Sequence, residues 1–215
     1  MLTSTARTII EGRTAMMQCR FDEQAEIAVS QQTRTVKIKN ETPRQRAERA
    51  AYHDKIGFWH PGTAIASMLK EAGSYHKQKG NRKSLKYIVP AGVIVLNDRL
   101  YIRNGDRKTL APDFEVDSRP VVIPATKGKI MAHRPRFDVW SMTFDLQINE
   151  DILDAETVYM LLKEGGERIG IGAFRPEKGG PYGLFNIVEW GVLDESSKKK
   201  TKAKRQRKRA VASGD

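Results

Sequence analysis

The sequence predicts an α+β protein built on a ferredoxin-like, RRM-like antiparallel sheet, with helices on one face, a glycine-rich loop and an inserted irregular lobe. The clearest support is the order of elements in the last third of the chain. A strand pattern at 137–148 is followed by a helix at 154–164, by a glycine-rich segment and by an apolar strand at 184–193. This order forms one β-α-β half of the fold. An earlier strand, a helix at 63–72 and the strands after that helix form the other half.

The strand pattern in the last third alternates between an apolar face and a more polar face, which predicts one buried side. The apolar face consists of Trp140, Met142, Phe144, Leu146 and Ile148. The next helix is expected to begin after the N-cap Asp154 and to pack Val158, Leu161 and Leu162 against the sheet. Trp190, in the final strand, is also assigned to the core.

The first third of the chain predicts strands and one exposed helix. Residues 14–21 are expected to form the first strand, continuing from the segment before it, and the alternation at 26–39 predicts a further strand or a hairpin. Residues 43–55 predict a helix with Thr42 as its cap and Pro43 in its first turn. Because this helix has few apolar side chains, we expect it to be exposed and basic.

The middle of the chain predicts a helix, two strands and an insertion. The helix at its start is marked by the N-cap candidate Thr63, an apolar stripe and the C-cap candidate Gly73. Residues 87–103 predict two strands joined by a turn near Asn97. Residues 104–136 contain four prolines and little regular pattern, so we expect an irregular excursion of the sheet there.

Composition restricts the class of protein. Of the 215 residues, 1–195 are expected to form one domain with its insertion at about 104–136. No apolar run approaches the roughly 20 residues that cross a bilayer, and the N-terminus lacks a secretory signal. Cys19 is the only cysteine, which excludes a disulfide or a cysteine-based zinc site within one chain. We therefore expect a cytoplasmic protein with no membrane partner, no metal and no cofactor.

The net charge of +12 is concentrated at the C-terminus. Residues 198–209 contain nine Lys and Arg residues and no acid, and the rest of the chain carries only +3. Residues 196–215 are predicted to be a basic, disordered tail. Such a tail is either a solubilising end or an arm that binds nucleic acid by releasing counterions from phosphates. In neither case does it contribute sequence specificity.

The glycine-rich loop, residues 166–183, is the main functional candidate. Seven glycines lie within residues 165–183, interleaved with Arg168, Arg175 and Lys178. Glycine permits close approach of a second backbone, and Arg and Lys donate hydrogen bonds to phosphates. These glycines follow a helix and precede a strand, so a dinucleotide-binding motif fits poorly, and the phosphate-loop motif GxxxxGK[ST] is absent. A hairpin whose glycines only serve turns is the alternative.

A second basic segment follows the first predicted helix of the ferredoxin-like half. Residues 76–86 contain five Lys or Arg residues, one glycine and no acid. This composition is typical of a mobile phosphate-binding loop and unsuited to a core. The alternative is a solvated surface loop.

Two motifs resemble the RAMP superfamily of CRISPR-associated proteins. HPGTAIASMLKEAG, residues 60–73, is similar to a helix start in that superfamily, and ERIGIGAFRPEKGGPYGLFNIVEW, residues 167–190, is similar to its glycine-rich loop and closing strand. The resemblance covers about residues 14–190 and is closest to the backbone subunit of CRISPR effectors (the seventh Cas family), which polymerises along a guide RNA. It implies a non-catalytic protein that binds single-stranded RNA, or DNA, as a homo-oligomer, with other effector subunits as partners.

The resemblance also implies where nucleic acid lies. The loop glycines are expected to shape the loop, and its cations are expected to meet phosphates. Four aromatic residues, Phe58, Trp59, Phe174 and Tyr182, are candidates to stack on bases. The expected nucleic-acid-binding residues are Lys70, His76, Lys77, Lys79, Arg82, Lys83, Arg134, Arg136, Arg168, Gly170, Gly172, Phe174, Arg175, Lys178, Gly179 and Gly180.

The chain departs from the backbone family in three respects. It is short, its glycine-rich loop is more elaborate than the usual form, and its basic tail is not part of the family pattern. Residues 104–136 are the candidate for the family's guide-kinking thumb. These departures leave a second interpretation open, a stand-alone relative encoded by a phage or mobile element that coats single-stranded DNA.

Catalysis is the third interpretation. None of the four histidines has the spacing of metal ligands. Metal-free RNA cleavage needs a general acid or base beside the scissile phosphate, and His60 or His76 would serve in a RAMP-type endoribonuclease. No catalytic residue is assigned. A structural protein whose tail alone binds nucleic acid is a further alternative.

Overall fold

The computed structural model describes residues 2–21, 41–78, 80, 82–122 and 128–194. The strand or hairpin predicted at 26–39, Lys79 and the basic tail lie outside these residues. No helix in the described part of the chain is long and apolar enough to span a membrane.

The body of the protein is a four-stranded antiparallel sheet with the order β4-β8-β1-β9. Its strands are β1 (Thr3–Gly12), β4 (Val93–Val95), β8 (Ser141–Asn149) and β9 (Phe185–Asp194). In chain order, the first and third strands are neighbours at the centre, and the second and fourth lie at the edges. This is the arrangement of two interlocked β-α-β units, so the predicted ferredoxin-like fold is confirmed.

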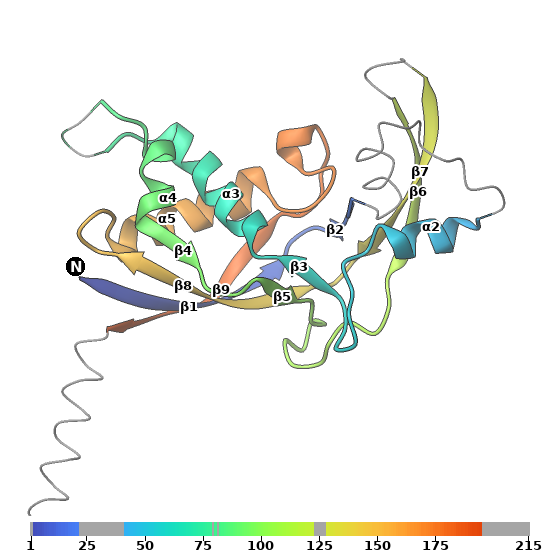
Figure 1. Ribbon diagram of the computed structural model, residues 1–215, viewed down its shortest axis with the longest axis horizontal. Coiled ribbons are helices and arrows are strands. Elements are labelled where there is room, and N and C mark those ends of the chain that lie inside the picture. Colours follow the sequence, from blue (N-terminus) through green and yellow to red (C-terminus); the bar gives the residue numbers. More distant parts are fainter. Residues whose placement is uncertain (1, 22–40, 79, 81, 123–127, 195–215) are drawn as a thin grey trace, which may run out of the picture.

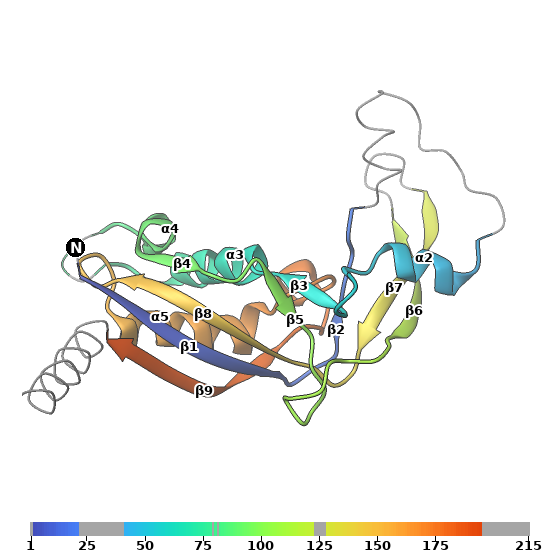
Figure 2. The same ribbon diagram turned by 60° about the horizontal axis from the view of Figure 1, so that its bottom comes forward.

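Helices cover one face of this sheet (Figures 1 and 2). They are α3 (Thr63–Ala72), the short α4 (Val89–Gly92) and α5 (Ala155–Glu164). α5 begins as predicted, because the carboxylate of Asp154 accepts a hydrogen bond from the Thr157 amide at 2.6 Å.

The core lies between β8 and the helices, as its alternation predicts. All five apolar residues expected on the buried side of this strand are at most 1 % exposed, and the three expected on α5 are fully buried. Trp140 is anchored by its Nε1, which donates to the carbonyl of Thr14 at 2.8 Å. Trp190 is only half-buried and lies at the margin of the core, where its ring contacts Tyr159.

The first strand lies earlier in the chain than predicted. β1 ends at Gly12, and the segment expected to be the first strand, 14–21, contains only the two-residue β2 (Met16–Met17), which belongs to another sheet. Ser4 and Thr8 occupy buried positions of β1, with exposures of 3 % and 0 %. Their hydroxyl groups interrupt the apolar alternation by which a strand is recognised.

Other elements of the first half are shorter than predicted. Residues 87–103 contain two strands, but β4 pairs with β8, and β5 (Arg99–Tyr101) pairs with β3 (Trp59–Pro61). α2 (Pro43–Arg49) stops six residues before the predicted end, although Thr42 caps it as expected, in a capping box with Gln45.

The turn between β4 and β5 determines where α3 begins. Gly62, and not Thr63, occupies the N-cap position, and its amide donates to the Asp98 carbonyl at 2.8 Å. A Cβ at Gly62 would lie 2.1 Å from the carbonyl oxygen of Asn97. Only glycine therefore fits at the start of the helix.

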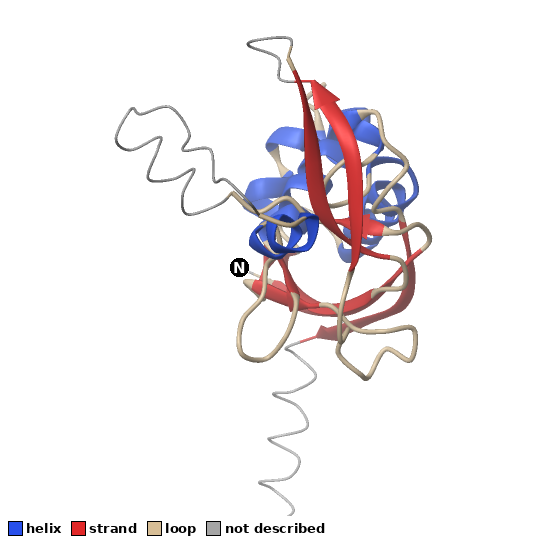
Figure 3. Ribbon diagram, turned by 90° about the vertical axis from the view of Figure 1, so that its right-hand side faces the viewer, coloured by secondary structure: helices blue, strands red, loops and turns tan. Residues whose placement is uncertain are grey.

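A second sheet forms a lobe beside the body. β6 (Glu115–Val122) and β7 (Lys129–Phe137) form a long hairpin, and the order of this sheet is β2-β7-β6. Figure 3 shows the two strands extending past the helices. The region 104–136 is thus more regular than predicted. Proline is uncommon inside strands, so Pro120 favoured irregular structure in the prediction. It lies in β6 at the edge of the sheet, where proline is tolerated.

Replacing Gly62 with alanine is expected to destabilise the protein by about 1–3 kcal/mol, because a methyl group would displace the Asn97 backbone. Urea unfolding measures the change. Gly191→Ala is the matched control, since nothing lies within 4 Å of a Cβ at that position. Equal midpoints for both variants would contradict the tight packing at Gly62.

Candidate nucleic-acid interface

The glycine-rich loop begins with a close contact under α3. A π-helical turn, Gly165–Ile169, continues α5. A Cβ at Gly165 would lie 1.7 Å from the Met68 sulfur, and one at Gly166 would lie 2.7 Å from Phe185. These two glycines therefore let the end of α5 pack against α3 and β9.

Beyond this turn, the glycines pack against the protein's own backbone. A Cβ at Gly172 would lie 2.4 Å from the Met17 carbonyl oxygen, and one at Gly180 would lie 1.9 Å from that of Phe174. A Cβ at Gly170 would lie farther from its nearest neighbour, 3.0 Å from the Gly183 carbonyl oxygen, and Gly179 has nothing within 4 Å. Gly172 and Gly180 thus shape the loop by close contact with the protein's own backbone.

A hollow of about 200 Å³ lies between the loop and the first turn of α3. Its walls are Pro61, Thr63, Ala64, Ser67, Met68, Gly170, Ile171, Gly172 and Arg175. The first amides of a helix have no intrahelical acceptors, and Gly62 offers no side chain to cap them. Those amides and the Arg175 guanidinium make the hollow suitable for an anion.

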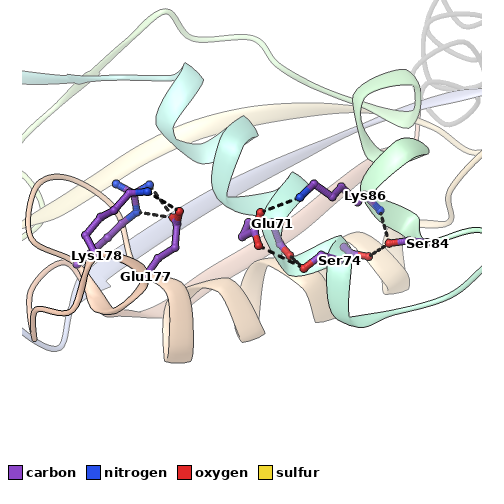
Figure 4. Close-up of polar contacts among 8 residues, drawn as sticks. Glu71, Ser74, Ser84, Lys86, Glu177 and Lys178 are labelled. Atoms are coloured by element: carbon purple, nitrogen blue, oxygen red, sulfur yellow. Dashed lines mark hydrogen bonds and ion pairs between the residues drawn. The ribbon is translucent and has the colours of Figure 1, made fainter. Parts of the chain in front are cut away.

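Arg175 is held at this hollow by partners within the loop. Its guanidinium donates to the Gly172 carbonyl at 3.0 Å and to Glu177 at 2.7 Å. Glu177 also pairs with Lys178 at 3.0 Å (Figure 4). Hydrogen bonds from Lys178 and Arg175 lower the pKa of Glu177, against the effect of its partial burial. One charged carboxylate therefore serves both cations, and such partly exposed pairs are weak enough to exchange for a phosphate.

The predicted basic residues at the other end of α3 divide into paired and unpaired groups. Glu164 brings His76 and Arg168 together, with Arg168 at 3.0 Å. Three exposed side chains, Lys70, Lys77 and Arg82, have no acidic partner among the described residues. Lys83 is also exposed.

The basic loop at 76–86 is anchored to the end of α3. Ser84 donates to the Gly73 carbonyl at 2.9 Å, and Lys86 pairs with Glu71 at 3.3 Å (Figure 4). The hydroxyl of Ser74 donates to the Glu71 carbonyl as well. Lys77, Arg82 and Lys83, which lie between Ser74 and Ser84 in the chain, are exposed.

The hairpin residues Arg134 and Arg136 are joined to the loop through β2. The Ala173 amide donates to the Met17 carbonyl at 2.8 Å, and Met17 pairs in register with Arg136. Figure 1 shows the loop, in orange, between α3 and the hairpin lobe. Arg136 itself is paired with Asp138 at 2.7 Å. The structure thus brings the loop and the hairpin cations together, although they are far apart in sequence.

The aromatic residues predicted to stack on bases have protein partners. Phe58 is partly buried and packs against two core phenylalanine rings at 5.5 Å. Trp59 contacts Tyr52 at 4.9 Å. One face of Phe174 and one face of Tyr182 are covered by Arg119 of β6, 5.0 Å from each centroid. Arg119 was not predicted, because its ring partners lie far along the chain.

His60 is buried and unsuited to general acid–base catalysis. It is 3 % exposed, and burial, reinforced by the charge of Arg175, lowers its pKa to about 4. Its Nδ1 lies 3.5 Å from Gln18, and its Nε2 has no partner among the described residues. Of the two predicted candidates, only His76 is accessible.

Between pH 7 and pH 5 the buried neutral His60 is expected to cost the protein about 2 kcal/mol of stability, because the unfolded chain takes up the proton that the folded state excludes. The contribution of the neutral His60 side chain to the free energy of unfolding is fully present above the unfolded pKa of 6.5. It is lost as the pH falls towards the folded pKa of about 4. Urea unfolding at the two pH values measures it. His60→Gln should reduce this dependence and the exposed His53→Gln should not; the same dependence in both variants would contradict the burial of a neutral imidazole.

Comparison with solved structures finds this fold in a type III-B Cmr-beta complex. A chain of a type III-B Cmr-beta complex, solved by cryo-EM bound to cognate target RNA, aligns with a TM-score of 0.50 and 13 % identity. The alignment covers 90 % of this protein but only 61 % of that chain, so this protein spans less than two thirds of it. Cmr6 from Pyrococcus furiosus aligns with a TM-score of 0.46 and 10 % identity over 86 % of this protein and 99 % of Cmr6.

No family model and no curated protein matches the sequence. The comparison therefore rests on the arrangement of strands and helices. The protein therefore has the ferredoxin-like fold of a chain in a type III-B Cmr-beta complex.

Proposed function

We propose that this protein binds single-stranded nucleic acid without cleaving it and that its copies assemble side by side along RNA. The main observation is the hollow at the first turn of α3. Thr63 and Ala64, in the first turn of α3, and Arg175, in the glycine-rich loop, line there a space of about 200 Å³. Helix N-termini and arginines are common phosphate ligands in proteins, so this hollow is our candidate seat for one backbone phosphate.

Cations extend the proposed binding surface from the hollow in two directions. One arm follows α3 to its C-terminal end and the basic loop, and the other crosses the glycine-rich loop to the hairpin. The two arms comprise Lys70, Lys77, Arg82, Lys83 and Arg168 on one side and Arg134, Arg136 and Lys178 on the other. Contacts of this kind follow a phosphate backbone and accept any base sequence.

The hairpin supports assembly along the strand. Val122, Ile130 and Met131, near its turn, are 57 %, 49 % and 51 % exposed. An apolar end on a projecting hairpin favours contact with a neighbouring molecule over isolation in water. We therefore propose that the hairpin is the thumb implied by the RAMP resemblance and that it contacts the next copy on the RNA.

RNA is our preferred ligand because the similar fold occurs in a complex bound to target RNA. CRISPR effector subunits are then the expected partners. A stand-alone protein of phage or mobile-element origin that coats single-stranded DNA remains the alternative. Affinities for RNA and DNA strands of equal sequence and length separate the two, because the 2′-hydroxyl distinguishes the ligands.

Replacing Arg168 and Arg175 together with alanine is expected to weaken binding of a strand of about 30 nucleotides by tenfold or more. The slope of log K against log salt should fall by about 0.7 for each phosphate that the variant no longer neutralises. Fluorescence anisotropy over a salt series measures both quantities. Arg7→Ala with Lys55→Ala removes the same charge from exposed positions outside the proposed surface.

That control pair should leave the affinity within about twofold of wild type, because distant charges are screened. Removal of residues 196–215 should weaken binding less than the loop pair does. The opposite ranking would assign binding to the tail and a structural role to the loop.

The protein is expected to leave bound RNA intact, because the accessible catalytic candidate, His76, is already paired with Glu164. End-labelled RNA incubated with excess protein and resolved on a denaturing gel tests this. Fragments that disappear in His76→Ala, but persist in the exposed-histidine control His53→Ala, would replace our proposal with a RAMP-type endoribonuclease.

A further inference from the structure

Arg119, on the outer strand of the hairpin, connects the hairpin with the glycine-rich loop. Its guanidinium lies 5.0 Å from the ring centroids of both Phe174 and Tyr182. It donates to the Tyr182 hydroxyl at 2.7 Å and to the Asp117 carboxylate at 2.6 Å. One side chain therefore contacts a carboxylate of the hairpin and two rings of the loop.

The chemistry of this contact requires arginine. Its planar guanidinium can stack on aromatic faces while its edge donates two hydrogen bonds to one carboxylate. The Asp117 side chain is 8 % exposed and that of Arg119 is 27 % exposed, so water screens the pair little. A lysine ammonium would keep the charge but would lack the planar, two-pronged donor geometry and the flat stacking surface.

The place of β6 in its sheet determines which part of the lobe Arg119 joins to the loop. The loop's backbone hydrogen bonds to the lobe end on the segment containing β2, from Ala173 to Met17 and from Gly183 to Ala15. β2 pairs with β7, and β6 is the far strand of that sheet. Among the described contacts, Arg119 thus provides the hydrogen bond from β6 to the loop. Ala132, its partner across the hairpin, is small and leaves the guanidinium room.

We infer that Arg119 is a positioning residue that holds the glycine-rich loop and the hairpin as one rigid surface, so that one strand of nucleic acid contacts both at the same time. This inference rests on the proposed function. When a strand is bound at one point, a rigid support holds the second binding point near it at a high effective concentration. That effective concentration falls when the support becomes flexible. Arg119 contributes in this way without itself contacting the strand.

The test compares Arg119→Met with Arg44→Met in the full-length protein. Arg44 is a matched control, because it also stacks on a ring, that of Phe114 at 3.8 Å, and pairs with the carboxylate of Asp113, but within the lobe. Amide hydrogen exchange in residues 170–183 of the free protein should accelerate about tenfold in Arg119→Met only. Arg119→Lys should fall between wild type and methionine.

Binding supplies the second readout. Affinity is measured for a trinucleotide, which is too short to reach from the hollow to the hairpin, and for an RNA of about ten nucleotides, which reaches both. Arg119→Met should weaken the longer RNA about tenfold and leave the trinucleotide within about twofold. Equal losses for both lengths, or unchanged loop exchange, would overturn the positioning role. A wild-type protein that binds neither RNA would overturn the proposed function, while hydrogen exchange would still report on the Arg119 interaction itself.

Discussion

The path of the chain between α5 and β9 is determined by contacts so close that no side chain fits. A Cβ at Gly165 would lie 1.7 Å from a sulfur of α3, and one at Gly183 would lie 1.8 Å from the carbonyl oxygen of Ile171. Side-chain-free positions of this kind leave the backbone few alternative routes. The loop therefore runs under α3 and beside β2 before it enters β9. That route places Arg175 at the first turn of α3 and Tyr182 against the hairpin.

The same packing places the cations of the proposed binding surface beside acidic side chains. Many of its cations are paired with acids, among them Arg168 with Glu164, and Arg175 and Lys178 with Glu177. Such pairs contribute little to stability when solvent reaches them, and a phosphate can take the place of the carboxylate. The unpaired amides of α3 add a fixed positive dipole end. Affinity on this account comes from several moderate contacts in register, and the rigidity of the loop and hairpin matters as much as the number of charges.

The sequence predicted the elements whose patterns are local. The alternation of β8, the cap at Asp154 and the strand–helix–loop–strand order were enough for the fold class. β1 was misplaced because Ser4 and Thr8 interrupt its buried face. The hairpin was expected to be irregular because proline is rare inside strands, although edge strands accept it.

The binding site was predictable only in part, because the partners of its residues lie far away in the sequence. Arg168, Arg175 and Lys178 stand out beside the glycines, but their acidic partners and the hollow depend on packing between segments distant in sequence. Arg119 has no local signal at all, since the tyrosine that it contacts is 63 residues away. His60, singled out by its residue type, is excluded as a catalyst only by its burial.

A structure of the full-length protein bound to single-stranded RNA, determined by cryo-electron microscopy, tests the central claim most directly. Our account predicts a backbone phosphate in the hollow, within hydrogen-bonding distance of Arg175 and of the first amides of α3, with the strand continuing towards the hairpin. RNA on the open face of the four-stranded sheet, or held by the tail alone with the hollow empty, would contradict it.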